Sequence, residues 1–354
     1  MLDFITEKRS CWEKLALETR PIFIYGMGDG AEKILTAFSR FNIRAEGVFA
    51  SDDFVRGHYF AGFKVMKYSE VELKYGDFVI VLAFGSSDEE IIERVRKMSQ
   101  QHTLYIPDVP VVGSGLFTYD YCLENAEKIQ AVYDMLEDEY SRKVYAAIIN
   151  FKISGNMKYI DEAATSKAEI YREIIKPNLY ESYVDLGAYN GDTVKEMLSL
   201  TKDRYVSIYA VEPDRKNFRK LCRSTEDKKH IKAYNAVSWC CDTQIPFSTK
   251  AGRQSSVSSS GEPIDAKSVD SILEGSQATL IKMDVEGCER EAIWGSVRTI
   301  KRYKPRLMIA LYHRNEDIFE LPLLVKKLNP GYKCYIRHQT YIPAWETNLY
   351  AVDE

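Results

Sequence analysis

Short apolar runs alternate with longer amphipathic stretches along most of the chain, and the first half contains four such runs. Most are bounded by Gly, Pro or Asp, and one of them leads into a stretch with helical spacing at 88–100. This alternation is typical of strands and helices in a parallel α/β sheet. The four predicted strands are 21–25, 47–50, 77–83 and 103–106. We therefore predict a small α/β unit that ends near Pro107 and Pro110.

Seven further apolar runs occupy the second half, with helical stretches at 288–301 and 317–328 between the later ones. The runs lie near residues 183, 208, 232 and 280 and at 306–311, 332–337 and 347–353. The last two runs are joined by too few residues for a parallel crossover, which needs about a dozen or more. They should therefore pair antiparallel, and we predict a mostly parallel sheet with an antiparallel last strand.

Residues 119–180 show helical spacing instead, for example at Ile129, Val132 and Leu136. Gly155-Asn156 interrupts this pattern, and a second helix is predicted near 161–175. We expect these helices to connect the two α/β parts and to pack in the core or between the domains; the alternative is that they form one wall or a lid of a ligand pocket.

Length and composition indicate a globular protein with more than one domain. The chain has 354 residues, of which 45% are hydrophobic and 28% charged. Its net charge of −4 gives no electrostatic reason to expect binding to nucleic acid or to an anionic membrane. No signal-peptide core, membrane-spanning apolar run or disulfide framework is evident. We expect a cytoplasmic protein, and a homo-oligomer remains open.

The stretch 184–193, Val-Asp-Leu-Gly-Ala-Tyr-Asn-Gly-Asp-Thr, is the clearest candidate for a ligand site. It is typical of a buried strand that ends at Asp185, a glycine-containing loop and the first turn of a helix. The next strand ends at Glu212, whose carboxylate can accept hydrogen bonds from two ribose hydroxyls. Together these features favour an adenosine-containing cofactor.

The glycine spacing argues against a dinucleotide. The loop reads G-x-x-x-G instead of G-x-G-x-x-G, and no Lys or Arg lies between Asp185 and Thr193 to bind a phosphate. Because Asp185 and Asp192 are acidic, the loop suits a cationic ligand better. S-adenosylmethionine carries a sulfonium, an ammonium and a ribose, and has no phosphate. The alternative is an ordinary strand–loop–helix turn with incidental glycines.

A third block, Leu-Ile-Lys-Met-Asp-Val-Glu-Gly-Cys-Glu at 280–289, is another apolar strand that ends in acids. The loop after Asp185, Val-Glu-Pro at 211–213 and this block, in that order, resemble the FkbM family of S-adenosylmethionine-dependent methyltransferases. The stretches 235–238 and 268–273 support the resemblance, which covers about residues 180–353. It implies the seven-stranded Rossmann-like sheet of a class I methyltransferase.

The resemblance also implies a division of the chain and a set of site residues. We expect a small Rossmann-like α/β domain at 1–112, a helical connector at 113–180 and an FkbM-like methyltransferase domain at 181–354. The methionine end of the cofactor would lie at the loop, the ribose at Glu212, and the adenine near Asn235. The expected cofactor-binding residues are Asp185, Gly187, Ala188, Gly191, Asp192, Thr193, Glu212, Asn235, Ala236 and Asp284.

The expected reaction is O-methylation of a hydroxyl on a sugar, glycan or small polar metabolite, an acceptor class that rests on family analogy. A hydroxyl acceptor needs a base within about 2.6–3.2 Å. The candidates are Asp284, Glu286 and His313. We favour His313 with Asp284, because histidine is the residue most naturally tuned to neutral pH. The alternatives are a packing role for His313 and helix capping for the two acids.

Further residues are expected on the substrate side. Arg253, Arg314 and His338 are predicted to bind the substrate, and Arg253 and Gln254 lie beside a Ser-rich segment, 255–261, that we predict to be a substrate flap. The side chains of Asp284, Glu286 and His313 are an alternative set of ligands for a divalent metal. Their spacing in the sequence is not that of a tight ligand set, so no metal is expected.

The N-terminal loop Gly26-Met27-Gly28-Asp29-Gly30-Ala31 matches G-x-G-x-x-A, the alanine variant of the dinucleotide fingerprint. An NAD- or nucleotide-sugar-binding protein that acts through this loop is therefore an alternative function. A non-catalytic cofactor-binding scaffold is another. Because the unit lacks the second half of a full dinucleotide fold, we favour glycines that serve helix–strand packing or substrate docking.

Overall fold

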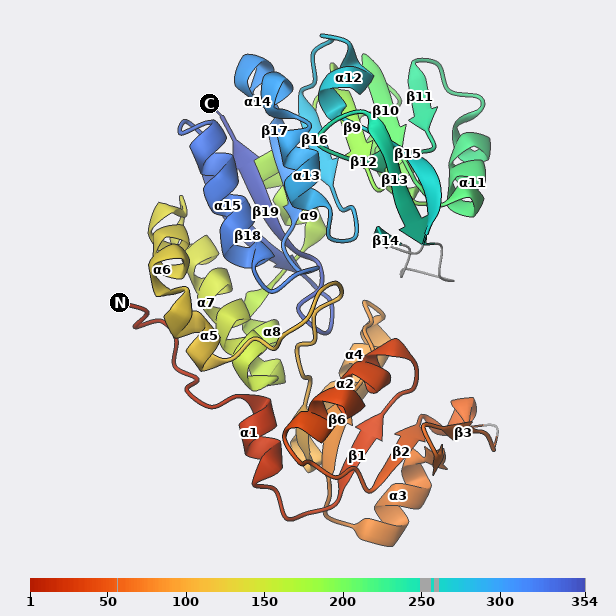
Figure 1. Cartoon of the computed structure of the whole chain (residues 1–354), viewed down its shortest axis with the longest axis vertical. Coiled ribbons are helices and arrows are strands. Elements are labelled where there is room, and N and C mark those ends of the chain that lie inside the picture. The colour runs from red at the N-terminus through yellow and green to blue at the C-terminus, as the bar shows by residue number, and fades with distance from the viewer. Residues whose placement is uncertain (56, 249–255, 258–260, 354) are drawn as a thin grey trace.

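The computed structural model describes residues 1–55, 57–248, 256–257 and 261–353. Figure 1 shows two α/β bodies, with the N-terminal one in red and orange and the C-terminal one in green and blue, and a group of yellow-green helices beside them. Each body is built around its own sheet. No helix in the described parts of the chain is long and apolar enough to cross a membrane.

The N-terminal body contains a five-stranded parallel sheet. Its order is β5 (Met66–Lys67), β2 (Gly47–Ala50), β1 (Ile22–Tyr25), β6 (Val79–Leu82) and β7 (Thr103–Tyr105). All residues of β1, β2 and β6 are buried, as expected for a parallel sheet that is covered on both faces. The four predicted strands are confirmed, whereas β5 was not predicted. The remaining elements are α1 (Cys11–Ala16), α2 (Asp29–Arg40), η1 (Asp52–Phe54), β3 (Tyr59–Phe60), β4 (Phe63–Lys64), α3 (Tyr68–Tyr75) and α4 (Glu89–Gln101).

The middle of the chain is mainly helical. It forms α5 (Tyr119–Glu124), α6 (Ala126–Met135), α7 (Glu139–Ser154), α8 (Met157–Ala163), β8 (Ala164–Thr165), α9 (Lys167–Ile170) and a π-helical segment, η2 (Tyr171–Ile175). The predicted interruption is confirmed, because Gly155 ends α7 with a left-handed φ of +63°. The single helix predicted at 161–175 is wrong, because Ala164–Thr165 leaves the helix and pairs with a strand of the large sheet.

The C-terminal body contains an eight-stranded sheet. Its order is β11 (Ile231–Tyr234), β10 (Ser207–Val211), β9 (Ser182–Leu186), β16 (Leu280–Met283), β17 (Arg306–Ala310), β19 (Thr347–Val352), β18 (Lys333–Gln339) and β8. All seven predicted strands are present, and β19 pairs antiparallel with both of its neighbours. Its helices are α10 (Asp192–Leu200), α11 (Arg215–Thr225), α12 (Val269–Leu273), α13 (Glu289–Trp294), α14 (Val297–Tyr303) and α15 (Asp317–Leu328). The helix predicted at 288–301 is divided into α13 and α14.

The segment between β11 and β16 forms a small second sheet. It consists of β12 (Val237–Ser238), β15 (Glu262–Lys267), β13 (Thr243–Ser248) and β14 (Ser256–Val257), and it was not predicted. Part of the proposed Ser-rich flap therefore forms a strand. Arg253 and Gln254, which were predicted beside this flap, lie outside the described residues.

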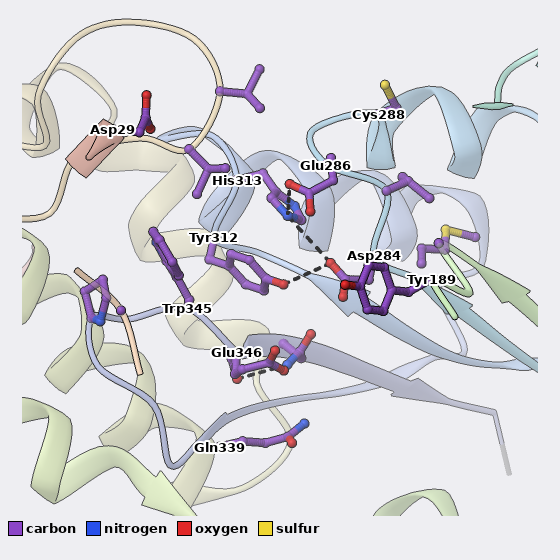
Figure 2. Close-up of a pocket in the computed structure, with 18 of the residues that line it drawn as sticks. Asp29, Tyr189, Asp284, Glu286, Cys288, Tyr312, His313, Gln339, Trp345 and Glu346 are labelled. Atoms are coloured by element: carbon purple, nitrogen blue, oxygen red, sulfur yellow. Dashed lines mark hydrogen bonds and ion pairs between the residues drawn. The ribbon is translucent and has the colours of Figure 1, made fainter. Parts of the chain in front are cut away.

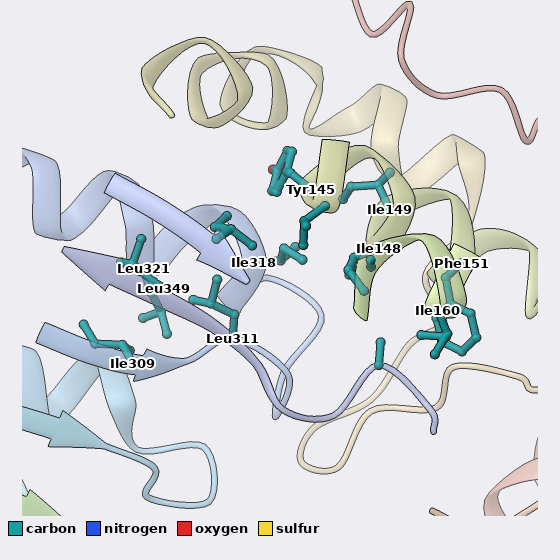
Figure 3. Packing of buried hydrophobic residues seen from close by; sticks show 14 of the residues in the cluster. Tyr145, Ile148, Ile149, Phe151, Ile160, Ile309, Leu311, Ile318, Leu321 and Leu349 are labelled. Atoms are coloured by element: carbon teal, nitrogen blue, oxygen red, sulfur yellow. The ribbon is translucent and has the colours of Figure 1, made fainter. Parts of the chain in front are cut away.

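The helices of the middle segment pack on the edge of the large sheet. Tyr145 and Ile148 of α7 belong to the same buried apolar cluster as Leu311 and Leu349 of the large-sheet region (Figure 3). The two bodies are also joined by backbone hydrogen bonds between Ser86 and Ile342 in both directions. The division at residues 112 and 180 remains a prediction.

Candidate active site

The carboxyl ends of β9, β10 and β16 meet at one edge of the large sheet, where ligands of α/β proteins usually bind. A cavity of about 880 Å³ opens there and extends to the N-terminal body. Seven of the predicted site residues line it: Gly187, Asp192, Thr193, Glu212, Asp284, Glu286 and His313. The topology of the sheet thus brings together residues from four separate segments of the sequence, which follow β9, β10, β16 and β17.

A buried ion pair between Asp185 and Lys282 supports the glycine loop from the side of the sheet. Asp185 is fully buried at the end of β9, and its carboxylate accepts a 2.5 Å hydrogen bond from the Thr193 hydroxyl. Its other oxygen lies 3.3 Å from Lys282 Nζ. Burial opposes the charge of Lys282, but the carboxylates of Asp185 and Asp284 outweigh it and raise the pKa of the ammonium. Asp185 therefore supports the loop from behind instead of lining the cavity.

Glu212 occupies the tip of β10, as predicted, and lines the cavity. Its two carboxylate oxygens accept backbone hydrogen bonds from Tyr189 at 2.9 Å and from Asp214 at 2.8 Å. Desolvation raises the pKa of this carboxyl to about 7, although these two N–H groups act in the opposite direction. Each oxygen still has a second lone pair, so the group can accept further hydrogen bonds from a ligand.

Four residues form a compact group at the end of β16 and β17, which we call the His313 cluster: Asp284, Glu286, Glu289 and His313. The imidazole is 1% exposed, and three carboxylates surround it. Its Nε2 lies 3.6 Å from Asp284 Oδ1 and 3.5 Å from Glu286 Oε2, on the cavity side (Figure 2). Its Nδ1 lies 2.9 Å from Glu289 Oε1.

This environment corrects the expectation that His313 is tuned to neutral pH. Burial disfavours the imidazolium, but the three carboxylates outweigh it, with Glu289 contributing most, and raise the pKa of His313 to about 10. With these neighbours alone the ring is protonated at neutral pH and cannot accept a proton. Asp284 and Glu286 lie on the cavity side, and their side chains are 32% and 34% exposed. They are therefore better placed than His313 to accept a proton from a ligand in the cavity.

Several cavity residues were missed by sequence reasoning. The Tyr312 hydroxyl donates a 2.9 Å hydrogen bond to Asp284, and Tyr189 lies in the glycine loop with its side chain 42% exposed. On the other side of the cavity lie Asp29 from the N-terminal body and Trp345 from the β18–β19 loop (Figure 2). The adjacent motifs could have indicated the tyrosines, but Trp345 is brought to the site by tertiary structure alone.

The other predicted cofactor residues do not line the cavity. The Asn235 amide donates to the backbone carbonyls of Glu212 and Pro213 at 2.9 Å, so it positions the tip of β10. Ala188 and Ala236 are buried in the packing around the loop and strand ends. Gly191, with a φ of +86°, forms the N-cap of α10.

The structure does not place Arg314 and His338, which were predicted to bind the substrate, in the cavity. His338 is fully buried, and its two ring nitrogens contact Thr347 Oγ1 at 3.0 Å and the Tyr341 carbonyl at 3.1 Å. Burial lowers the pKa of His338 to about 4. Arg314 does not line the cavity, because its Nε donates to the Gly287 carbonyl at 3.0 Å. Arg253 lies outside the described residues.

The N-terminal glycine loop opens into the same cavity through Met27, Asp29 and Gly30. A Cβ atom on Gly30 would lie 2.2 Å from the Ala83 carbonyl oxygen, so this glycine is needed for tight packing of α2 on β6. Asp29, in the first turn of α2, places a carboxylate where a dinucleotide would bring its phosphates. The geometry therefore favours a packing role for the glycines of this loop over the binding of a dinucleotide.

Comparison with known proteins agrees with this geometry. Residues 185–334 match the model of the methyltransferase FkbM domain. This part of the chain is therefore similar to the methyltransferase FkbM domain. The match spans the glycine loop, the tip of β10 and the His313 cluster.

One solved structure has the same fold over nearly the whole chain. The structure of a methyltransferase FkbM from Methylobacillus flagellatus KT has a TM-score of 0.72 at 22% identity, over 99% of this chain and 95% of that one. Aeropyrum pernix fibrillarin, solved with natively bound S-adenosyl-L-methionine, has a TM-score of 0.33 at 15% identity, over 49% of this chain and 68% of that one. No curated protein matched the sequence. The topology of the large sheet and the first of these structures agree with the expected class I methyltransferase fold.

Proposed function

We propose that this protein is an S-adenosylmethionine-dependent methyltransferase that methylates a hydroxyl group of a sugar, a glycan or a small polar metabolite. The observation that carries the proposal is the position of Glu212. It is a buried carboxylate at the tip of β10, faces the cavity and lies beside the glycine loop of the region that is similar to the methyltransferase FkbM domain. This is the place where a ribose is held in folds of this class.

The charges around the loop also fit this cofactor. Asp192, Glu212 and Asp214 line this end of the cavity, and Lys282 is engaged by Asp185 beneath the loop. Carboxylates attract the sulfonium and ammonium of S-adenosylmethionine and repel the phosphates of a nucleotide. When bound, the cofactor supplies an electrophilic methyl group on sulfur.

The chain itself must hold the acceptor hydroxyl in line with that methyl group, and such positioning can supply much of the rate enhancement. Asp284 faces the cavity and is oriented by the Tyr312 hydroxyl. We assign it the role of accepting the hydrogen bond, and then the proton, of the acceptor hydroxyl. Glu286 is the second carboxylate within reach of the same region.

The far wall of the cavity suits a hydroxyl-rich acceptor. Trp345 offers an aromatic surface, while Asp29 and Glu346 offer carboxylates that can accept hydrogen bonds from hydroxyls. Because Asp29 comes from the N-terminal body, that body would contribute to acceptor selection. Trp345→Ala should then reduce methyl transfer to a panel of free sugars while leaving the affinity for the cofactor unchanged.

The first experiment is calorimetric titration of the full chain with S-adenosylmethionine and, separately, with NADH. Binding of S-adenosylmethionine at micromolar concentration that is lost in Glu212→Ala would support the proposal. Glu226→Ala, which removes an exposed acid after α11, is the matched control and should bind normally. Binding of NADH alone would move the functional centre to Gly26–Ala31, and binding of neither ligand would favour a non-catalytic scaffold.

A further inference from the structure

The helix α11 presents a strongly basic face to solvent, which we call the α11 basic face. Figure 1 shows this helix on the outer side of the C-terminal body. The nine consecutive residues 215–223 contain five basic residues and no acid. At 3.6 residues per turn the five fall within about 140° of the helix circumference, and all of them are exposed. They are Arg215, Lys216, Arg219, Lys220 and Arg223.

These charges are not balanced within the described parts of the chain. None of the five residues forms an ion pair or a side-chain hydrogen bond with another described residue. Two acids that flank the helix are engaged elsewhere. Asp214 caps the helix by accepting the Asn217 backbone N–H at 2.8 Å, and Asp227 lies 4.0 Å from Lys228. The positive charge of the α11 basic face is therefore available to an anionic partner.

The basic face acts against the stability of the helix that carries it. Arg219 has a like-charged neighbour four residues away on each side, Arg215 and Arg223, and Lys216 has Lys220, and such pairs destabilise a helix. Arg215 and Lys216 also occupy the first turn, where the helix dipole disfavours cations. Departures from local preference of this kind are expected at functional surfaces. Contact with an anionic surface would relieve both costs.

The arrangement of the five side chains fits an extended anionic surface. Side chains spread over so wide an arc cannot converge on one small anion, which is usually bound in a concave site. Single-stranded nucleic acids are commonly held by aromatic side chains that stack on the bases. Phe218, the aromatic residue of α11, packs inward against a buried apolar cluster instead. The face therefore offers charge over an area without a means of reading bases.

Exposed apolar side chains lie near the C-terminal end of the same helix. The Tyr205 hydroxyl donates to the Lys229 carbonyl at 2.6 Å and so joins the turn before β10 to the turn after α11. The next residue, Val206, is 56% exposed, and its N–H donates to the Glu181 carbonyl at 2.7 Å. Tyr180, which precedes Glu181, is 77% exposed. Tyrosine and aliphatic side chains beside basic residues are typical of surfaces that contact lipid headgroups.

We propose that the α11 basic face binds the anionic surface of a lipid membrane as a peripheral contact. Anionic headgroups attract Lys and Arg side chains, and this attraction falls off within about one Debye length. Only the charges of the contacting face therefore matter, so a chain with a net charge of −4 can still bind. The proposal reverses the expectation that was drawn from the net charge. None of the five residues lines the cavity, so membrane binding goes beyond the proposed function and does not depend on it.

The test is co-sedimentation of the full chain with vesicles of phosphatidylcholine alone and with vesicles of equal parts phosphatidylcholine and phosphatidylglycerol. We expect binding to the anionic vesicles only. Raising the ionic strength from about 0.1 M to about 1 M shortens the Debye length from about 10 Å to about 3 Å and should release the protein. Arg219→Glu combined with Lys220→Glu should weaken binding about thirtyfold or more, because two attractive charges are lost and two repulsive ones are added.

Arg40→Glu combined with Arg44→Glu is the matched control, because it makes the same change of charge at exposed residues of the N-terminal body. It should bind the anionic vesicles like the unmodified chain. All four positions are exposed, so both variants are expected to fold.

No binding to the anionic vesicles, or equal binding by the α11 variant, would overturn the proposal. Binding to heparin or polyuridylic acid without binding to the vesicles would also overturn it and would assign the face to a soluble polyanion. S-adenosylmethionine is absent from this test, so its failure and the failure of the proposed function are distinguishable.

Discussion

Gly187 lies so close to Asp284 that a Cβ atom on the glycine would come within 1.8 Å of the Asp284 backbone carbonyl oxygen. The loop after β9 and the loop after β16 are thus in direct backbone contact at the edge of the cavity. Gly187 also has a φ of +79°, which other residues rarely adopt. Two independent constraints therefore require glycine at this position.

Gly187→Ala should consequently destabilise the protein strongly. The left-handed backbone alone costs an alanine about 1–2 kcal/mol, and the clash with Asp284 adds to this by pushing the two loops apart. Gly275→Ala is the matched control, since its φ is +85° but nothing lies within 4 Å of the added atom. Urea denaturation of both variants should show a clearly larger loss for Gly187→Ala. Equal losses would mean that the loops move apart easily.

The pair of Asp185 and Lys282 should be strongly coupled. Lys282→Met leaves the carboxylate of Asp185 buried without its cation, and such changes typically cost about 3–5 kcal/mol. Adding Asp185→Asn removes the uncompensated charge, so the double variant should be more stable than Lys282→Met alone. A double-mutant cycle of unfolding free energies measures this coupling. Additive losses would show that the two groups do not stabilise one another.

Cofactor affinity should rise with pH through neutrality because of Glu212. The pKa of its carboxyl is raised to about 7 by burial, whereas ribose hydroxyls donate to the ionised form. Binding should therefore be about tenfold weaker at pH 6 than at pH 8 and should release a proton. Calorimetry in two buffers with different heats of ionisation would detect this proton. In Glu212→Gln the affinity should be lower and nearly independent of pH, and a pH profile unchanged by the substitution would refute this explanation.

Acid should destabilise the protein through His338. Because burial lowers the folded-state pKa of His338 to about 4, below the ordinary value of 6.5, the unfolded chain takes up its proton first as the pH falls. The contribution of His338 to the free energy of unfolding is therefore fully present above pH 6.5. It falls by up to about 3 kcal/mol as the pH is lowered to about 4. His338→Gln should flatten this part of a plot of unfolding free energy against pH. A slope as steep as that of the original chain would assign the acid sensitivity to other groups.

Local patterns were sufficient to predict much of the fold. The apolar runs marked the strands of both bodies because buried parallel strands must be continuously apolar, and β18 and β19 had to pair antiparallel because their connection is short. The two residues of β8 and the strands of the small sheet were missed. β8 pairs with β18, which is distant in the sequence. The strands of the small sheet have few apolar side chains, so no local pattern of residues marks them.

For the site, the sequence alone determined which strand ends carry chemistry: the acid and glycine spacing identified Glu212, Asp284 and the loop at Gly187 as members of one site. Only the tertiary structure decided what each side chain does. It placed three carboxylates around His313, buried His338 away from the cavity, and brought Trp345 to the same cavity as Asp29. The physical reason is that charge state and accessibility depend on neighbours contributed by other elements, and these neighbours are set by packing and not by local sequence.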